Sequence, residues 1–185
     1  MLKILSPLEH FETKGFIRLE QVNSTDLDFV DQFPTAEEMK QMTLEELTLD
    51  RPIEGLFKEE MVGLDTQIRQ QIEGEFNKNI ELMDMAIWEC SDPKRADWHF
   101  DHLPGDWGAT ADLIVTYYFD SVSEDTGGSI DFQYEGVEES HYPNARDIVI
   151  INNRWDQQGQ WMHRVSLLKD KTHRRRMAGF YYKWT

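Results

Sequence analysis

Ala111-Asp-Leu-Ile-Val-Thr-Tyr-Tyr-Phe-Asp120 is a short run of mainly apolar, β-branched and aromatic residues. A second such run, Ser129-Ile-Asp-Phe-Gln-Tyr134, follows shortly after it. Between them, Glu124-Asp-Thr-Gly-Gly128 supplies the acidic and glycine residues that are typical of turns. The pattern therefore predicts two short strands joined by a glycine-containing turn.

The same alternation of short apolar runs and turn residues extends over the second half of the chain. An early strand is also expected between Lys14 and Val22. In this segment Phe16, Arg18 and Glu20 alternate with Ile17, Leu19 and Gln21. Glu135-Gly-Val-Glu-Glu-Ser140 is interpreted as a solvated turn. Many short strands favour a sandwich or a small barrel. The strands predicted after residue 84 are Asp84–Cys90, Asp97–Asp101, Ala111–Asp120, Ser129–Tyr134, Asp147–Asn152, Gln160–Val165 and Arg174–Lys183.

Helical signals dominate before residue 84. The strongest predicts a helix from about Leu56 to Leu82, with one apolar stripe formed by Phe57, Met61, Leu64, Ile68, Ile72 and Phe76. Two capping-box patterns predict one or two short helices between Thr35 and Leu49. We interpret residues 1–185 as a single domain, in which residues 1–83 are a mainly helical support and residues 84–185 form the β core.

Composition limits the class of protein. The chain has 185 residues and a formal net charge of −16, and a surface this acidic repels phosphate backbones. We therefore expect no nucleic-acid partner. The single cysteine, Cys90, excludes an intramolecular disulfide and favours a reducing compartment. No apolar run approaches the length of a membrane helix, so we expect no membrane partner and a cytoplasmic location.

His99-Phe-Asp101 is the first candidate for chemistry. Residues two apart on a strand point to the same side, so His99 and Asp101 would project together. An imidazole and a carboxylate on one face are two of the three ligands of the 2-His-1-carboxylate site of non-haem iron oxygenases, although zinc accepts the same ligands. His163, on another predicted strand, could supply the third ligand. The alternative is a half-buried histidine packed under Trp161.

Arg174 and Arg176 are candidates for binding an anion. Strand alternation places both on one face with Ala178 and Phe180. An arginine that points into an apolar interior requires an anionic partner, and its planar guanidinium can bind a carboxylate through two hydrogen bonds. The alternative for three consecutive arginines is an exposed basic strand end.

These residues together resemble a known family. His99-x-Asp101, then His163, then an arginine eleven residues later is similar to the pattern of the iron(II)/2-oxoglutarate-dependent dioxygenases. The resemblance covers about residues 84–185. It implies a double-stranded β-helix, which is a jelly-roll or cupin-like barrel, as the fold of the β core.

Further motifs point to the prolyl hydroxylase-like branch of that family. Leu113–Asp120, followed by Gly127-Gly-Ser-Ile-Asp-Phe132, resembles the strand, acidic turn and double-glycine strand of that branch. Asp147-Ile-Val-Ile-Ile-Asn-Asn153 resembles the strand and turn that precede the distal histidine. Several loose motifs in the same order are more specific than any one of them.

The resemblance implies a role for each matching residue. His99, Asp101 and His163 would bind Fe(II), and no catalytic residue is implied beyond this metal centre. Arg174 would bind the distal carboxylate of 2-oxoglutarate, with Arg176 as the alternative. The arginine-x5-arginine pattern of the nucleic-acid demethylase branch is absent, because Phe180 stands at the second position.

On the strand before the glycine pair, Tyr118 would donate its hydroxyl to the same carboxylate of 2-oxoglutarate. Strand alternation would place Thr116 and Ile114 in the same cavity.

The implied activity is hydroxylation coupled to the conversion of 2-oxoglutarate and O2 to succinate and CO2. The substrate stays open: a peptidyl or free amino acid, prolyl-like, or another small metabolite. Trp155, Trp161 and Arg154 lie near the distal ligand in the sequence and are candidate substrate contacts. One alternative is a non-redox cupin-type metal-binding protein, acting as a sensor or an isomerase. Another is an acidic interaction protein without a metal.

Overall fold

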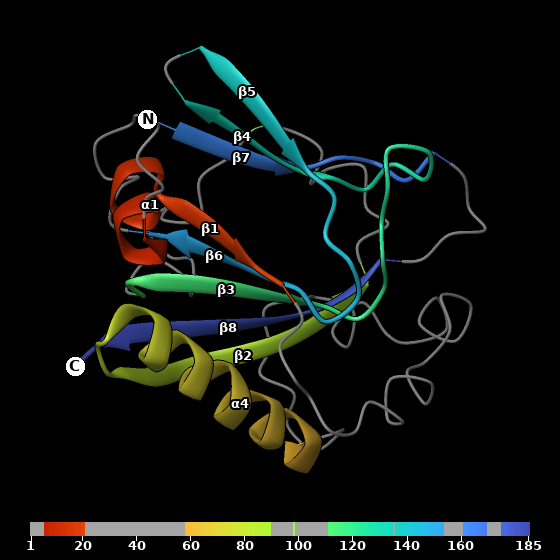
Figure 1. Cartoon of the computed structure of the whole chain (residues 1–185). Helices are drawn as coiled ribbons and strands as arrows, with labels where there is room; N and C mark the ends of the chain where they lie inside the picture. The colour runs from red at the N-terminus through yellow and green to blue at the C-terminus, as the bar shows by residue number, and fades with distance from the viewer. Residues whose placement is uncertain are drawn as a thin grey trace.

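A computed structural model describes residues 6–20, 58–89, 98, 111–134, 136–153, 161–169 and 175–185. Two antiparallel sheets face one another across the interior (Figure 1). The helices expected between Thr35 and Leu49 lie outside the described residues. So does the strand expected at Asp97–Asp101, apart from Trp98. Within the described parts of the chain, no helix combines the length and apolar composition that crossing a bilayer requires.

The large sheet has five strands in the order β1-β6-β3-β8-β2, and all its pairings are antiparallel. Its early strand β1 pairs with β6, so the N-terminal segment is part of the β core rather than of the helical support. The bounds are β1 Phe16–Leu19, β6 Ile148–Asn152, β3 Leu113–Tyr118, β8 Arg176–Trp184 and β2 Ile80–Glu89. Each of these strands overlaps a predicted one.

The small sheet has three described strands in the order β5-β4-β7. They are β5 Val137–His141, β4 Ile130–Tyr134 and β7 Trp161–Val165. The interpretation of Glu135–Ser140 as a turn was wrong, because most of this segment belongs to β5 and pairs with β4. Its residues are mostly exposed, so no apolar alternation marked it as a strand.

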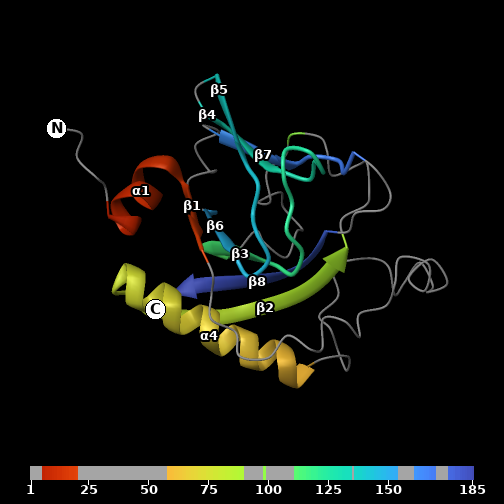
Figure 2. The ribbon, with the colours of Figure 1, turned by 45° about the vertical axis from the view of Figure 1, so that its right-hand side comes forward.

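Two helices cover the outer face of the large sheet or its edge. The shorter helix α1, Pro7–Lys14, packs beside β1, and Ser6 and Glu9 form a reciprocal capping box at its start. The longer helix α4, Lys58–Phe76, runs along the face that is turned away from the small sheet, beneath β8 and β2 (Figures 1 and 2). The small sheet therefore closes one face of the large sheet, and α4 covers the other.

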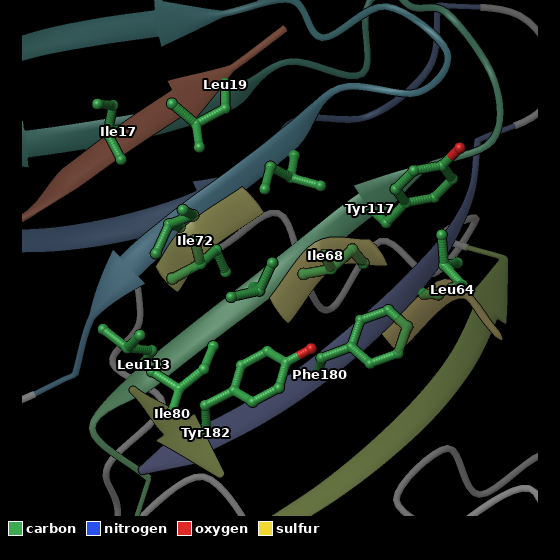
Figure 3. Packing of buried hydrophobic residues seen from close by; sticks show 14 of the residues in the cluster. Ile17, Leu19, Leu64, Ile68, Ile72, Ile80, Leu113, Tyr117, Phe180 and Tyr182 are labelled. Carbon is green, nitrogen blue, oxygen red and sulfur yellow. The ribbon is translucent and has the colours of Figure 1, made fainter. Parts of the chain in front are cut away.

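The main hydrophobic core lies between α4 and the large sheet. Leu64, Ile68 and Ile72 point from the helix toward the side chains of the strands (Figure 3). The Tyr182 hydroxyl donates to Asp65 Oδ1 at 3.0 Å, and burial raises the pKa of the Asp65 carboxyl despite this hydrogen bond. The strand residues of this core include Leu113, Val115, Tyr117, Ile148, Ile150, Ala178, Phe180 and Tyr182.

We expect Ile68→Ala to lower the free energy of unfolding by about 2–5 kcal/mol, because Ile68 is fully buried and its removal leaves a cavity. Val62→Ala on the same helix is the control, since Val62 is 48% exposed and should cost less than about 0.5 kcal/mol. Urea unfolding of the two variants measures the difference. Equal losses would contradict the position of Ile68 in this core.

Candidate active site

The interior between the two sheets is lined by a second set of buried side chains. Prediction from strand alternation placed Ile114 and Thr116 on the same face as Tyr118. Ile114 and Tyr118 indeed belong to this inner cluster, and Thr116 lies between them on β3, where it is also buried. The other buried members are Phe16, Ile130, Phe132, Val149, Ile151 and Met177. The inner face of β3 is thus largely apolar, with a hydroxyl from Thr116 and one from Tyr118.

His163 belongs to the same interior. It lies on β7 opposite Phe132 of β4, and the two ring centroids are 6.4 Å apart. Phe132 is a member of the inner cluster, so alternation along the two paired strands turns His163 inward as well. Only 6% of His163 is exposed. The predicted distal ligand is therefore a buried imidazole that faces the large sheet.

The arginines at the start of β8 are divided between the two faces of the large sheet. Arg176 lies on the same face of β8 as Ala178 and Phe180, which pack in the core between α4 and the large sheet. Its guanidinium binds Asp120 through two hydrogen bonds, from Nε at 2.9 Å and from Nη2 at 2.7 Å. The prediction that this face points into the cavity was wrong, because the large sheet is covered by apolar layers on both sides. Arg174 lies outside the described residues.

Arg175, which sequence reasoning did not single out, extends toward the small sheet. Its Nη1 donates to the backbone oxygen of Ser166, just beyond β7, at 2.7 Å. Only 1% of Arg175 is exposed. It stands two residues before Met177, a member of the inner cluster, so the two side chains point to the same face. A buried guanidinium therefore lies on the inner face at one end of β8.

Tyr118 lies on β3, and Arg175 directly precedes the neighbouring strand β8 on that inner face. Tyr118 of β3 pairs with Met177 of β8, and Met177 is two residues beyond Arg175. Thr116 pairs with Gly179 further along the same two strands. The interior thus combines a cation with hydroxyl donors at one end of the β3–β8 pair, which is a chemistry suited to an anionic ligand.

The glycine pair makes room for this arginine. Gly128 has φ of +84°, and a Cβ built on it would lie 3.1 Å from Arg175 Nη1 and 2.8 Å from Leu168 Cδ2. Gly127 also has a positive φ, and a Cβ there would lie 2.6 Å from the backbone oxygen of Leu167. Both the backbone conformation and the close approach of neighbours therefore require glycine at these positions.

We expect Gly128→Ala to cost about 3 kcal/mol of unfolding free energy, from left-handed strain together with overpacking against Arg175 and Leu168. Gly136→Ala is a matched control, because Gly136 has φ of +80° but nothing within 4 Å of a built Cβ. The control should therefore cost only the strain, about 1 kcal/mol. Urea unfolding measures both, and an equal cost would contradict the steric role of Gly128.

The remaining expected site residues lie outside what the structure describes. These are His99, Asp101, Arg154 and Trp155, together with the side chain of Trp161, whose backbone is in β7. Among the described residues there is no group of three His, Cys, Asp or Glu side chains that could hold a metal ion, and two of the three expected ligands are not among them.

Trp98, which directly precedes His99, is described and lies against β7. Its ring centroid is 4.4 Å from Cζ of Arg164, the residue after His163. Arg164 in turn donates from Nε to Asp131 Oδ2 at 2.9 Å. Burial opposes ionisation of Asp131, but hydrogen bonds from Ser129, Arg164 and Ser140 outweigh it, so the pKa of Asp131 lies below its usual value.

The sequence matches no protein-family model and no curated protein. Solved structures with a similar arrangement were found. A prolyl-4-hydroxylase from Pseudomonas putida has a TM-score of 0.57 and 17% identity, covering 95% of this chain and 92% of that one. A viral collagen prolyl hydroxylase from Paramecium bursaria Chlorella virus-1 has a TM-score of 0.62 and 10% identity, covering 100% and 96%. The chain has the double-stranded β-helix fold of the prolyl hydroxylases.

This confirms the fold predicted from the resemblance. A third similar structure is HygX from Streptomyces hygroscopicus with nickel and 2-oxoglutarate bound, with a TM-score of 0.59 and 13% identity, covering 97% of this chain and 87% of that one. In this double-stranded β-helix, His163 lies on β7 of the small sheet and Arg175 directly precedes β8 of the large sheet, and both are directed into the space between the sheets.

Proposed function

We propose that the protein is an Fe(II)/2-oxoglutarate-dependent dioxygenase that hydroxylates an organic substrate. The observation that carries the proposal is the buried guanidinium of Arg175, which extends between the two sheets beside a glycine pair. A guanidinium on an inner face that otherwise carries mainly apolar groups and the hydroxyls of Thr116 and Tyr118 is suited to bind a carboxylate. In this fold His163 faces inward from the opposite sheet. A dicarboxylic acid is therefore the ligand that best suits the Arg175 guanidinium.

The metal would be held by His99, Asp101 and His163. Two neutral imidazoles and one carboxylate match the facial ligand set of non-haem iron, so the chemistry of these donors fits the group. The position of Trp98 against Arg164 supports convergence, because His99 and His163 are the covalent neighbours of these two residues. Bound iron would supply the activation of O2, and the protein residues would fix the ligand geometry and exclude water.

The cosubstrate site would be formed by Arg175 and Tyr118, with Thr116 beside them. The guanidinium can bind the distal carboxylate of 2-oxoglutarate through two hydrogen bonds, and the phenol can donate a third. Met177, which pairs with Tyr118, and Gly128 leave the guanidinium flanked by small or apolar groups. Arg174 remains the alternative anchor from the sequence pattern.

The substrate class stays open between a peptidyl or free amino acid and another small metabolite. A peptide is supported by one similar structure, a Trichoplax adhaerens prolyl hydroxylase in complex with a peptide fragment of hypoxia inducible factor. The formal charge of −16 argues against nucleic acid. We retain Trp155, Trp161 and Arg154 as candidate substrate contacts and the cytoplasm as the proposed location, since the single cysteine favours a reducing compartment.

An anaerobic titration of metal-free protein with Fe(II) and then with 2-oxoglutarate tests the proposal. We expect the visible charge-transfer band of the chelated cosubstrate to reach an absorbance proportional to the protein concentration. Metal binding without this band would favour the non-redox cupin-type alternative. Absence of both metal binding and the band would contradict the convergence of His99, Asp101 and His163.

A further inference from the structure

The outer face of the small sheet carries a polar cluster around Arg164, the residue that follows the expected ligand His163. Arg164 of β7 lies opposite Asp131 of β4, and its Nε donates to Asp131 Oδ2 at 2.9 Å. Its Nη2 is also 4.0 Å from Glu138 Oε2 of β5. The indole of Trp98 stacks on the same guanidinium, with 4.4 Å between Cζ and the ring centroid. Arg164 therefore joins Trp98 to all three described strands of this sheet.

Asp131 is held firmly in place. Only 3% of it is exposed, and Ser129 Oγ donates to its Oδ1 at 2.7 Å. Ser129 Oγ also shares a hydrogen bond of 2.8 Å with Ser166 Oγ, and Ser166 is the residue whose backbone oxygen accepts from Arg175. Because Asp131 is fixed, the plane of the Arg164 guanidinium is fixed as well, and it offers a stable surface for the indole.

The two stacked residues are covalent neighbours of the two expected histidine ligands. Trp98 directly precedes His99, and Arg164 directly follows His163. Consecutive Cα atoms are about 3.8 Å apart, so the contact between Trp98 and Arg164 links the residues that directly adjoin the two expected ligands in the sequence. Along β7, Arg164 faces outward with Asp131 while His163 faces inward with Phe132. The stack therefore lies on the face of β7 opposite to His163.

We propose that Trp98 is a positioning residue that sets the spacing of His99 and His163 by stacking on Arg164, which Asp131 anchors. The proposal rests on the proposed function, because it takes both histidines as metal ligands. A partly exposed cation–π contact adds little to the stability of a fold. Residues that orient metal ligands without touching the metal commonly change its affinity by about 10–100-fold when they are lost.

Co(II) binding to the metal-free protein, followed by calorimetry and visible absorption, tests this role without turnover. We expect Trp98→Ala to raise the Co(II) dissociation constant about tenfold. Trp98→Phe should recover most of the affinity, since a phenyl face also attracts a guanidinium. Arg164→Met should weaken binding to a similar degree, and the double variant should be no worse than either single variant, because all remove one contact.

The matched control is Trp184→Ala. Trp184 is stacked beneath Lys78 Nζ, 5.2 Å from the ring centroid, at the end of β8 and away from β7. It carries the same kind of contact, so it reports the effect of losing an indole on the fold alone. Urea unfolding of every variant accompanies the binding measurements. We expect Co(II) affinity in Trp184→Ala to match that of the unmodified protein.

Different results would overturn the positioning role of Trp98 and the proposed function. If the unmodified protein binds Co(II), His163→Ala does not, and Trp98→Ala binds as tightly as the unmodified protein, the positioning role is overturned and the metal site stands. Equal weakening in Trp98→Ala and Trp184→Ala also overturns it, because the effect would then be general loosening. If the unmodified protein binds no Co(II), the proposed function itself fails.

Discussion

Under the proposed function, His163→Ala is expected to lower the affinity for Fe(II) by at least about 100-fold and to abolish the conversion of 2-oxoglutarate to succinate. The reason is that His163 is buried on the inner face of β7, where its imidazole faces the interior between the two sheets and can serve as a direct ligand. Loss of a direct ligand should exceed the 10–100-fold effect of residues that only support one. Calorimetry with Fe(II) under anaerobic conditions and an assay for succinate measure the two effects.

His10→Ala is the control for this variant. His10 lies on α1, where its ring makes an edge contact with Phe16 at 6.1 Å, so its loss should leave metal binding unchanged. Unaltered Fe(II) affinity in His163→Ala, in a protein that unfolds like the original, would show that this imidazole is not a ligand.

Arg175→Met is expected to raise the 2-oxoglutarate concentration needed for the charge-transfer band by at least about 100-fold, while Fe(II) affinity stays nearly constant. Two charge-assisted hydrogen bonds to the distal carboxylate would be lost, each worth about 1.5–3 kcal/mol. Methionine fills much of the same volume and removes a buried charge, so the fold should tolerate the change. Titration of the Fe(II)-loaded variant with 2-oxoglutarate gives the shift.

Arg174→Met and Arg176→Met complete this comparison. Arg176 is bound to Asp120 through its backbone nitrogen and its guanidinium, so its replacement should reduce stability and leave cosubstrate binding unchanged. A large shift in Arg174→Met together with none in Arg175→Met would assign the anchor to Arg174, as the sequence pattern originally indicated.

The strands of the β core were largely predictable, whereas the end of the long helix was not. The predicted helix ran on to Leu82, although its apolar stripe ends at Phe76; Ile80 stands four residues further on, a spacing that is also compatible with a helix. The structure ends α4 at Phe76, and Asn77 adopts a left-handed conformation with φ of +50°. This turn lets Ile80 begin β2 while its side chain still joins the same core.

The identity of the inward arginine could not be predicted from alternation. Strand β8 is buried on both faces. Met177 faces the small sheet, and Ala178 and Phe180 face α4. Period-two reasoning identifies residues that share a face, but it identifies the inner face only when one face is polar. Both faces of β8 are mainly apolar, so the choice among three consecutive arginines required the packing of the two sheets.

Strand β5 has a consequence for how copies of the protein meet in concentrated solution. Among the described strands, β5 pairs with β4 alone, and its other edge pairs with no described strand. A free strand edge is a template for intermolecular pairing. Glu138 and Glu139 are exposed on this strand, beside Val137, which is 67% exposed. Carboxylates along an edge repel the same edge of another copy, and the overall charge of −16 adds to this repulsion. The acidic residues that made β5 difficult to predict from the sequence thus disfavour intermolecular pairing along this edge.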